Sequence, residues 1–137
     1  MDCKKSVIYL ANTASTSIVA GGTIPLLATV RRKGRRFSSN GNGASIAAAR
    51  CDEYYDVYVN VSFTAVVAGN VTISLVQDGA EVIGANQTIT VTTEGTQSVA
   101  VSFPAVVRVN ACSASALSIT SSAAITVTNA TMKVVEY

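Results

Sequence analysis

The chain contains no histidine and no tryptophan among its 137 residues. Histidine is the commonest general base and the commonest metal ligand in proteins, so its absence removes both. A Ser-His-Asp or Cys-His catalytic site is therefore impossible within one chain. No other group of residues supplies an activated nucleophile at neutral pH. We expect a protein that is not an enzyme, with no catalytic residues, no cofactor and no metal site.

Charge is also scarce. Charged residues make up 13% of the chain and apolar residues 49%, whereas about 25% charged residues is usual for a soluble domain. Such a chain covers its surface with serine, threonine, asparagine and glycine, or buries part of that surface against copies of itself. We expect both.

The three cysteines are odd in number and widely spaced, at Cys3, Cys51 and Cys112. This spacing argues against a closed disulfide framework and against a CxxC metal or redox site. Free cysteine usually behaves as a small hydrophobic side chain. We therefore expect Cys51 and Cys112 to be buried.

The start of the sequence shows no signal peptide and no membrane span. The only apolar stretch after Lys4 and Lys5 is SVIYLA, residues 6–11, which is too short for either. We expect no membrane partner, and a protein made in a reducing cytoplasm that reaches the outside of the cell only by lysis.

Alternation of apolar and polar residues dominates the chain from residue 54 onward. In YYDVYVNVSFTA, residues 54–65, every second residue is apolar, which predicts a long strand with one face on a core. Asp78-Gly79 predicts a two-residue hairpin turn, because this pair tolerates positive φ at both positions. The apolar row consists of Tyr55, Val57, Val59, Val61, Phe63 and Ala65.

Shorter apolar rows follow as far as the C-terminus. Turn residues separate them at intervals of about ten residues, the spacing of an antiparallel sandwich or barrel. Pro104 should mark a bulge or a strand end, because it cannot donate a hydrogen bond to a strand ladder. The length predicts a single domain over residues 1–137. The rows include Val71, Ile73 and Leu75, then Val99, Val101 and Phe103, then Leu117 and Ile119, and then Met132 and Val134.

The first third of the chain is less regular. VIYLA, residues 7–11, predicts an opening strand, and residues 15–30 predict a second strand with a Gly-Gly interruption. RRKGRRFSSNGNG, residues 31–43, predicts a polar, glycine-rich loop. ASIAAAR, residues 44–50, predicts a short strand or a helical turn, because seven residues without a clear cap form a marginal helix.

Half of the ten basic residues lie within this predicted loop. Five cations within six residues can bind phosphates or an acidic protein surface. A solvated loop, docking on an acidic protein partner and binding of nucleic acid all stay open. Nucleic acid is the least favoured, because Phe37 is the only aromatic residue nearby and single-strand binding usually needs several stacking platforms. The candidate partner-binding residues are Arg31, Arg32, Lys33, Arg35 and Arg36.

Three tyrosines, Tyr54, Tyr55 and Tyr58, cluster at the start of the longest predicted strand. Tyr58 lies on the polar row. An outward tyrosine covers a large area at a small cost in entropy, which suits a subunit interface. We take the three tyrosines as a candidate interface, with packing under a neighbouring loop as the alternative.

Carboxylates occur in two groups. Asp52, Glu53 and Asp56 predict a solvated edge or an interface partner for arginine, and a glycosidase-like or cation site is the less favoured alternative. Asp78 and Glu81 flank the predicted hairpin turn, and turn chemistry is a sufficient explanation for them.

The order of these segments resembles a known family. The resemblance covers about residues 7–137 and lies in AGGTIPLLATV (20–30), in the stretch from YYDVYVNVSFTA to TITV (54–91), in SVAVSFPAVVRVN (98–110) and in AAITVTNATMKVVEY (123–137). It is a resemblance to the tumour-necrosis-factor/C1q-like jelly rolls of bacterial and phage proteins. These include the C-terminal knobs of bacillus exosporium filaments.

The resemblance implies an all-β antiparallel jelly-roll sandwich that assembles as a homotrimer. No collagen-like Gly-x-y repeat precedes the domain, and knobs without a stalk look like phage structural proteins. The resemblance thus implies a non-enzymatic virion component, such as a capsid decoration or head fibre, located in the virion, whose partners are itself and a capsid or other virion protein. The basic loop is not part of the family pattern.

The alternative is a carbohydrate- or receptor-binding module of a phage tail, or of a bacterial or spore surface. Its site would combine the Tyr54 to Tyr58 cluster with Asp52 and Asp56. A surface glycan or a receptor would then be the partner.

Overall fold

The computed structural model describes residues 6–92 and 97–136, and this part of the chain forms strands without any helix. The described residues thus contain no helix that could cross a membrane. The predicted all-β class is confirmed. The strands are β1 (Val7–Asn12), β2 (Thr16–Ile18), β3 (Ala28–Lys33), β4 (Phe37–Ser39), β5 (Gly43–Ile46), β6 (Glu53–Ala65), β7 (Gly69–Gln77), β8 (Ala80–Val91), β9 (Ser98–Val109), β10 (Ser115–Ser121) and β11 (Ile125–Glu136).

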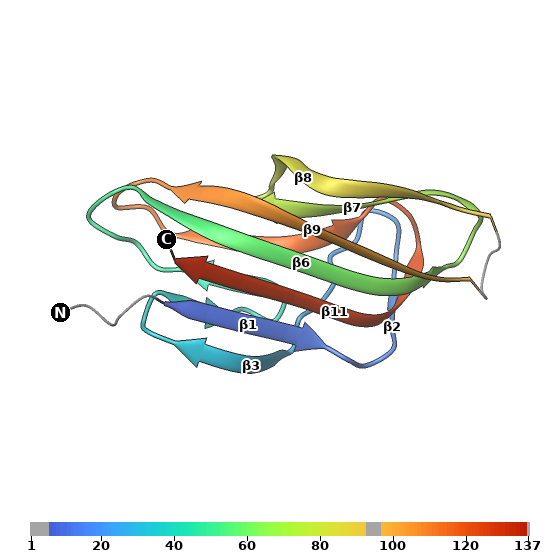
Figure 1. Cartoon of the computed structure of the whole chain (residues 1–137), viewed down its shortest axis with the longest axis horizontal. Coiled ribbons are helices and arrows are strands. Elements are labelled where there is room, and N and C mark those ends of the chain that lie inside the picture. Colours follow the sequence, from blue (N-terminus) through green and yellow to red (C-terminus); the bar gives the residue numbers. More distant parts are fainter. Residues whose placement is uncertain (1–5, 93–96, 137) are drawn as a thin grey trace.

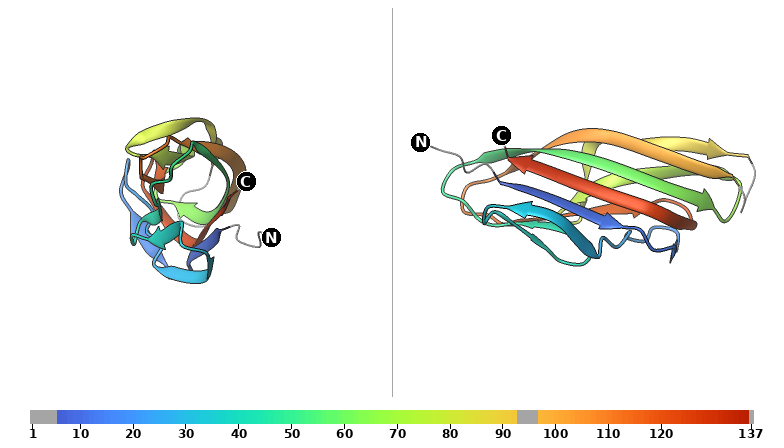
Figure 2. Two further views of the ribbon diagram at one scale, coloured as in Figure 1. Left: turned by 90° about the vertical axis from the view of Figure 1, so that its left-hand side faces the viewer. Right: turned by 60° about the horizontal axis from the view of Figure 1, so that its bottom comes forward.

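The strands form two antiparallel sheets that pack face to face (Figures 1 and 2). A six-stranded sheet has the order β3-β1-β11-β6-β9, with β2 paired to β11, and a five-stranded sheet has the order β4-β5-β10-β7-β8. Strands distant in sequence are neighbours, because β1 near the start of the chain pairs with β11 at its end. The edges of the larger sheet are β3 and β9.

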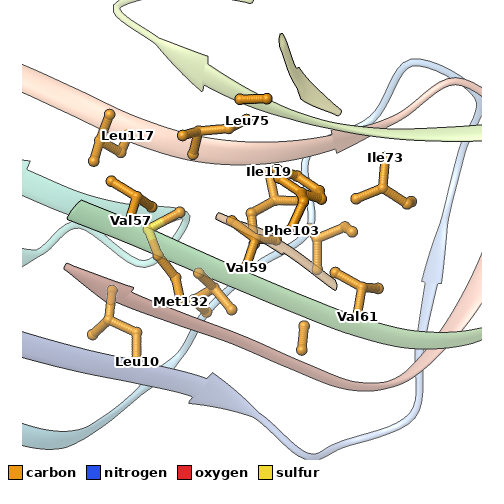
Figure 3. Packing of buried hydrophobic residues seen from close by; sticks show 14 of the residues in the cluster. Leu10, Val57, Val59, Val61, Ile73, Leu75, Phe103, Leu117, Ile119 and Met132 are labelled. Atoms are coloured by element: carbon orange, nitrogen blue, oxygen red, sulfur yellow. The ribbon is translucent and has the colours of Figure 1, made fainter. Parts of the chain in front are cut away.

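The core lies between the two sheets and contains the apolar rows that the sequence predicts. All six residues of the apolar row of β6 are buried. Figure 3 shows side chains of β6, β7 and β10 meeting across the interior, among them Val59, Leu75 and Ile119. Alternation places every second residue of these strands on an outer face of the sandwich.

The hairpin predicted at Asp78-Gly79 is present between β7 and β8. Both residues have positive φ, 53° and 85°, as a type I′ turn requires. The carboxylate of Asp78 also accepts hydrogen bonds from the Ser115 hydroxyl and the Ala116 N–H, each at 2.8 Å. This turn is therefore tied to β10 as well.

The single loop predicted over residues 31–43 is wrong. Residues 31–33 are the end of β3, residues 37–39 form β4, and β5 begins at Gly43. β3 and β4 are edge strands, whose backbone is paired on one side only, and the long polar side chains of β3 remain in water. An edge strand therefore needs no apolar row to form.

Three further details of the sequence prediction change. Pro104 lies inside β9 and marks neither a bulge nor a strand end; it is tolerated there because β9 is an edge strand with one unpaired side. Residues 15–30 form two strands, β2 and the start of β3, instead of one. Of the alternatives for residues 44–50, the strand is correct as far as Ile46.

Candidate functional site

The two outer faces of the sandwich differ in chemistry. On the five-stranded sheet, the outward residues of β7 and β8 are largely hydroxyls and amides that bond to one another. Thr72 and Thr88 share a hydrogen bond of 2.7 Å between their hydroxyls, and the Thr90 hydroxyl donates to the Asn70 side-chain oxygen at 2.8 Å. Ile83, near the hairpin end of β8, is a fully exposed exception. Most of this face suits contact with water.

The outer face of the six-stranded sheet, which we call the open face, carries tyrosine, valine and proline. Tyr54, Tyr58 and Val106 are 46%, 47% and 51% exposed. Pro104 lies directly opposite Tyr58 in the pairing of β6 with β9. The open face thus leaves apolar and aromatic area in water, which the other face largely avoids.

A row of paired residues crosses the open face from edge to edge. The strand pairings place Arg31 beside Tyr9, Tyr9 beside Lys133, Lys133 beside Tyr58, and Tyr58 beside Pro104. The Lys133 ammonium lies over the Tyr58 ring, 5.5 Å from its centroid, within range of a cation–π interaction. Cations and tyrosines therefore alternate along this row.

The next row along the open face is more apolar. It runs from Lys33 through Val7 and Val135 to Asp56 and Val106. Among the described residues, Asp56 forms no ion pair. Each of the two rows thus begins with a cation of β3 and ends on an apolar residue of β9.

The first row and the β3 end of the second row line a hollow of about 940 Å³. Its lining includes Tyr9, Tyr58, Asn60, Ser102 and the basic residues of β3, and it contains no carboxylate. Aromatic rings, hydrogen-bonding groups and positive charge thus meet at one place on the open face.

The five predicted basic residues do not act as one group. Arg36 is half-buried, forms an ion pair of 2.8 Å with Glu53 and donates to the Ala48 carbonyl oxygen at 3.2 Å. The other four, at positions 31, 32, 33 and 35, are exposed and pair with no carboxylate of residues 6–92 and 97–136. Arg36 supports the structure, and the remaining four are available to a partner.

The tyrosine cluster divides as well. Tyr54 and Tyr58 lie on the open face, whereas Tyr55 is fully buried and meets the Phe37 ring edge-on, with 5.4 Å between ring centroids. The Tyr55 hydroxyl donates to a carboxylate oxygen of Glu53, and burial together with this contact raises the pKa of Tyr55. Tyr55 was therefore wrongly included in the candidate interface, because a core residue cannot contact a partner.

Two of the three carboxylates near the start of β6, Asp52 and Glu53, form ion pairs with arginines of the same chain, whereas the sequence predicts a solvated edge or an arginine across an interface. Asp52 pairs with Arg108 at 2.5 Å and accepts the Ala111 N–H at 2.7 Å; Glu53 pairs with Arg36. The hydrogen bond from Arg108, followed by the one from Ala111, lowers the pKa of Asp52. In the described part of the chain, no group of three potential ligands could hold a metal ion.

The lowered pKa of Asp52 predicts a pH-dependent contribution to stability. Its stabilisation is complete above the usual aspartate pKa of about 3.9 and is lost as the pH falls through the lower pKa of the folded state. We expect Asp52→Asn to lower the melting temperature at neutral pH and to have little effect in strong acid. Thermal melts of both proteins across this range test it, and an equal loss at every pH would contradict it.

The prediction that Cys51 and Cys112 are buried is wrong, because both are exposed. Cys112 occupies a turn in which the Ser113 N–H donates to the Asn110 carbonyl oxygen at 3.1 Å, and its φ is 62°. Both cysteines line a shallow hollow between the β5–β6 and β9–β10 loops. The chain reverses on the surface at this end of the sandwich, where no core is present to cover the thiols.

Exposure makes both thiols reactive in the folded protein. In a Cys3→Ser background, which removes the cysteine outside the described residues, we expect two thiols per chain to react with Ellman's reagent without denaturant. Cys51→Ser and Cys112→Ser should each remove one. Reaction only after addition of guanidinium would show that the thiols are buried.

Sequence reasoning missed Tyr9 and Lys133, which complete the row on the open face. Tyr9 lies between Ile8 and Leu10, which are both fully buried. Alternation within VIYLA could have placed it on an outer face. Its position beside Lys133 depends on the pairing of β1 with β11, which alternation does not reveal.

Comparison with solved structures identifies the fold family. No sequence-family description matches the chain, and no curated protein does, but many solved structures match it. The PRD1 vertex protein P5 superposes with a TM-score of 0.64 at 13% identity, covering 98% of each chain. Murine APRIL superposes with a TM-score of 0.71 at 15% identity, covering 98% of this chain and 100% of the APRIL chain. The globular domain of zebrafish complement 1qA superposes with a TM-score of 0.64 at 10% identity, covering 97% of this chain and 96% of that domain.

The fold is a tumour-necrosis-factor/C1q-like jelly roll. This confirms the resemblance noted in the sequence. Identities of 10–15% show the jelly-roll fold alone, so the function has to be argued from the surface of this chain.

Proposed function

We propose that this jelly roll is a non-enzymatic structural protein of a phage virion, such as a capsid decoration or a head-fibre knob, that acts as a homotrimer. The observation that carries the proposal is the open face, where Tyr54, Tyr58, Pro104 and Val106 form an aromatic and apolar surface on one sheet only. Fully buried interface cores are enriched in aromatic residues and depleted in charge. The open face has this aromatic and apolar character at these four residues, and the charged residues beside them on β6 and β9 are Asp56 and Arg108, which is paired with Asp52.

The chemistry of the open face also limits how copies can meet. Its unpaired cations lie on β3 and β11, whereas Asp56, Pro104 and Val106 lie on β6 and β9, where the one cation, Arg108, is paired with Asp52. A contact that brings the β6–β9 side of one copy against a different part of the next copy is heterologous, and such contacts form a ring when the rotation between copies closes. A threefold ring satisfies this geometry and covers the tyrosines.

The virion location rests on the fold and on exposed charge. A phage vertex protein is among the proteins that share this fold. The exposed cations Arg31, Arg32, Lys33 and Arg35 lie to one side of the open face and suit an acidic capsid surface. The sequence contains no histidine, and a structural role agrees with that composition.

Native mass by light scattering tests the homotrimer. One chain has a mass of 14.1 kDa, and we expect three times this mass at low and at high salt, because apolar and aromatic contacts are not screened by ions. A monomer in both buffers would overturn the proposal. Co-sedimentation with purified capsids tests the location, and failure to pellet at low salt would count against it.

The hollow on the open face favours a second candidate function, a carbohydrate- or receptor-binding module of a phage tail or of a bacterial or spore surface. Its volume of about 940 Å³ lies within the usual range for ligand sites. Tyr9 and Tyr58 offer ring faces, and Asn60 and Ser102 offer hydrogen bonds, which together suit a sugar ring. A glycan array separates the two candidates, because only this one predicts saturable binding of a defined glycan.

A further inference from the structure

Strand β3 leaves one backbone edge unpaired. It stands at the end of the six-stranded sheet and pairs with β1 alone among the described strands. All six residues of Ala28–Lys33 are exposed. Backbone N–H and C=O groups along such an edge are a template on which another extended chain can pair.

The same edge carries an uncompensated positive charge. Arg31, Arg32 and Lys33 are consecutive, and Arg35 follows after one glycine. Within residues 6–92 and 97–136, the carboxylates in ion pairs are Glu53 and Asp52, which bind Arg36 and Arg108 instead. The adjoining hollow adds Lys133 and contains no carboxylate. The β3 edge thus combines unpaired backbone groups with cations that form no ion pair in the described part of the chain.

These two properties together select the class of partner. Edge-to-edge pairing between two copies would bring like charges together, so a second copy of the chain is repelled. A nucleic acid could neutralise the cations but could not pair with the backbone of β3. Tyr9 and Tyr58 line the adjoining hollow and could stack on bases, but such binding would leave the backbone edge of β3 unpaired.

We propose that the β3 edge binds an extended acidic segment of another protein by strand addition. Arg31 and Lys33 lie on the face that also holds Tyr9 and Val7, and Arg32 lies on the opposite face. The preferred segment therefore has acidic residues at alternating positions, two of which face Arg31 and Lys33. This inference rests on the proposed function and names the chemistry of its virion partner.

Strand addition at β3 leaves the proposed trimer contact accessible. β3 and β9 are opposite edges of the same sheet. The apolar residues of the trimer contact lie on β6 and β9, the distant side of the open face. One chain can therefore contact its own copies and an acidic partner together, provided that the second patch of the heterologous contact lies away from the β3 edge.

The experiment measures binding of a synthetic ten-residue peptide of alternating glutamate and threonine by fluorescence anisotropy at low salt. The matched peptide is methylated on alternate backbone nitrogens, which keeps every charge but removes the donors needed for strand pairing. We expect the methylated peptide to bind at least about tenfold more weakly, and both affinities to fall as salt rises. An oligonucleotide of thymidine is the third probe.

The matching protein variant replaces all three cations, R31S/R32S/K33S, and its control is Arg50→Ser, an exposed cation in the β5–β6 loop. We expect a loss of binding of at least about tenfold in the triple variant and an unchanged affinity in the control. If the triple variant does not fold, the comparison of the two peptides on the unaltered protein still decides.

Two results would overturn the inference: equal binding of the methylated and unmethylated peptides, or tighter binding of the oligonucleotide than of either peptide. Native mass is read on the same samples. A trimer that does not bind the acidic peptide would support the proposed assembly and overturn this inference. A monomer that binds the peptide would overturn the proposed assembly and support strand addition at β3.

Discussion

Val106→Lys is expected to convert the assembled protein into folded monomers. Val106 lies on the open face directly opposite Asp56. In a monomer the new ammonium group can pair with this carboxylate in water, so the fold is not disturbed. In the trimer the same pair would be buried, and removal from water costs several kcal/mol per ion. We expect the trimer to weaken by at least about a thousandfold, which is about 4 kcal/mol.

The control places the same charge on the other sheet. Ala116 is exposed on β10, between two inward residues of the five-stranded sheet. Ala116→Lys should remain a trimer, because its side chain projects from the face that we expect to stay in water. Light scattering gives the mass of both variants, and circular dichroism shows whether each is folded. A trimeric Val106→Lys protein would exclude the open face as the contact.

The inner strands follow directly from the sequence, because burial of one face imposes a strict pattern. Val71, Ile73 and Leu75 of β7 are all fully buried, as their alternation predicts. A shift by one residue would move this entire row from the core to the surface, which selection against exposed apolar rows prevents. The same reasoning holds for β6 and β11, and also for β9, which is an edge strand but buries one face against the core.

The edge strand β3 does not follow from the sequence in this way. The residues of β3 face water on both sides, so they are free to be arginine and lysine and look like a loop. Pro104 is misleading for a related reason: a proline would disrupt a central strand, but it is tolerated in β9 because this strand pairs on one side only. Alternation of apolar and polar residues reports burial of one face, so it cannot reveal a strand such as β3 whose residues are all exposed.

The candidate site is only partly predictable for a different reason. Tyr58 is found because it breaks the alternation of its own strand, and an exposed tyrosine on a regular strand stands out. Its neighbours in the row, Tyr9 and Lys133, come from the two ends of the chain. Tyr55 was misjudged because proximity in sequence was given more weight than its place in the apolar row. The surface is assembled across strands, so single-strand patterns cannot define it.

Gly43→Ala is expected to destabilise the fold far more than a single methyl group usually does. A Cβ atom added at Gly43 would lie 1.8 Å from the carbonyl oxygen of Leu117 and 2.9 Å from its carbonyl carbon. Both are backbone atoms of β10, which pairs with β5 at this point. The clash therefore cannot be relieved by turning a side chain.

Relief requires β5 to move away from β10. This would break their ladder and open the core around Ala44 and Ile46, which are now fully and almost fully buried. Overpacked cores usually lose about 1–3 kcal/mol. Because backbone pairing is lost as well, we expect a decrease of at least about 3 kcal/mol in the free energy of unfolding.

Gly41→Ala is the matched control, two residues earlier in the same turn. Gly41 has a φ of 86° and no heavy atom within 4 Å of an added Cβ, so the substitution costs only the backbone strain of about 1–2 kcal/mol. Urea unfolding in the monomeric Val106→Lys background separates these changes from effects on assembly. Equal losses in the two variants would mean that β5 does not lie against β10 as closely as the fold requires. A much larger loss for Gly43→Ala would show that glycine is needed there for close strand approach and not for its freedom of φ.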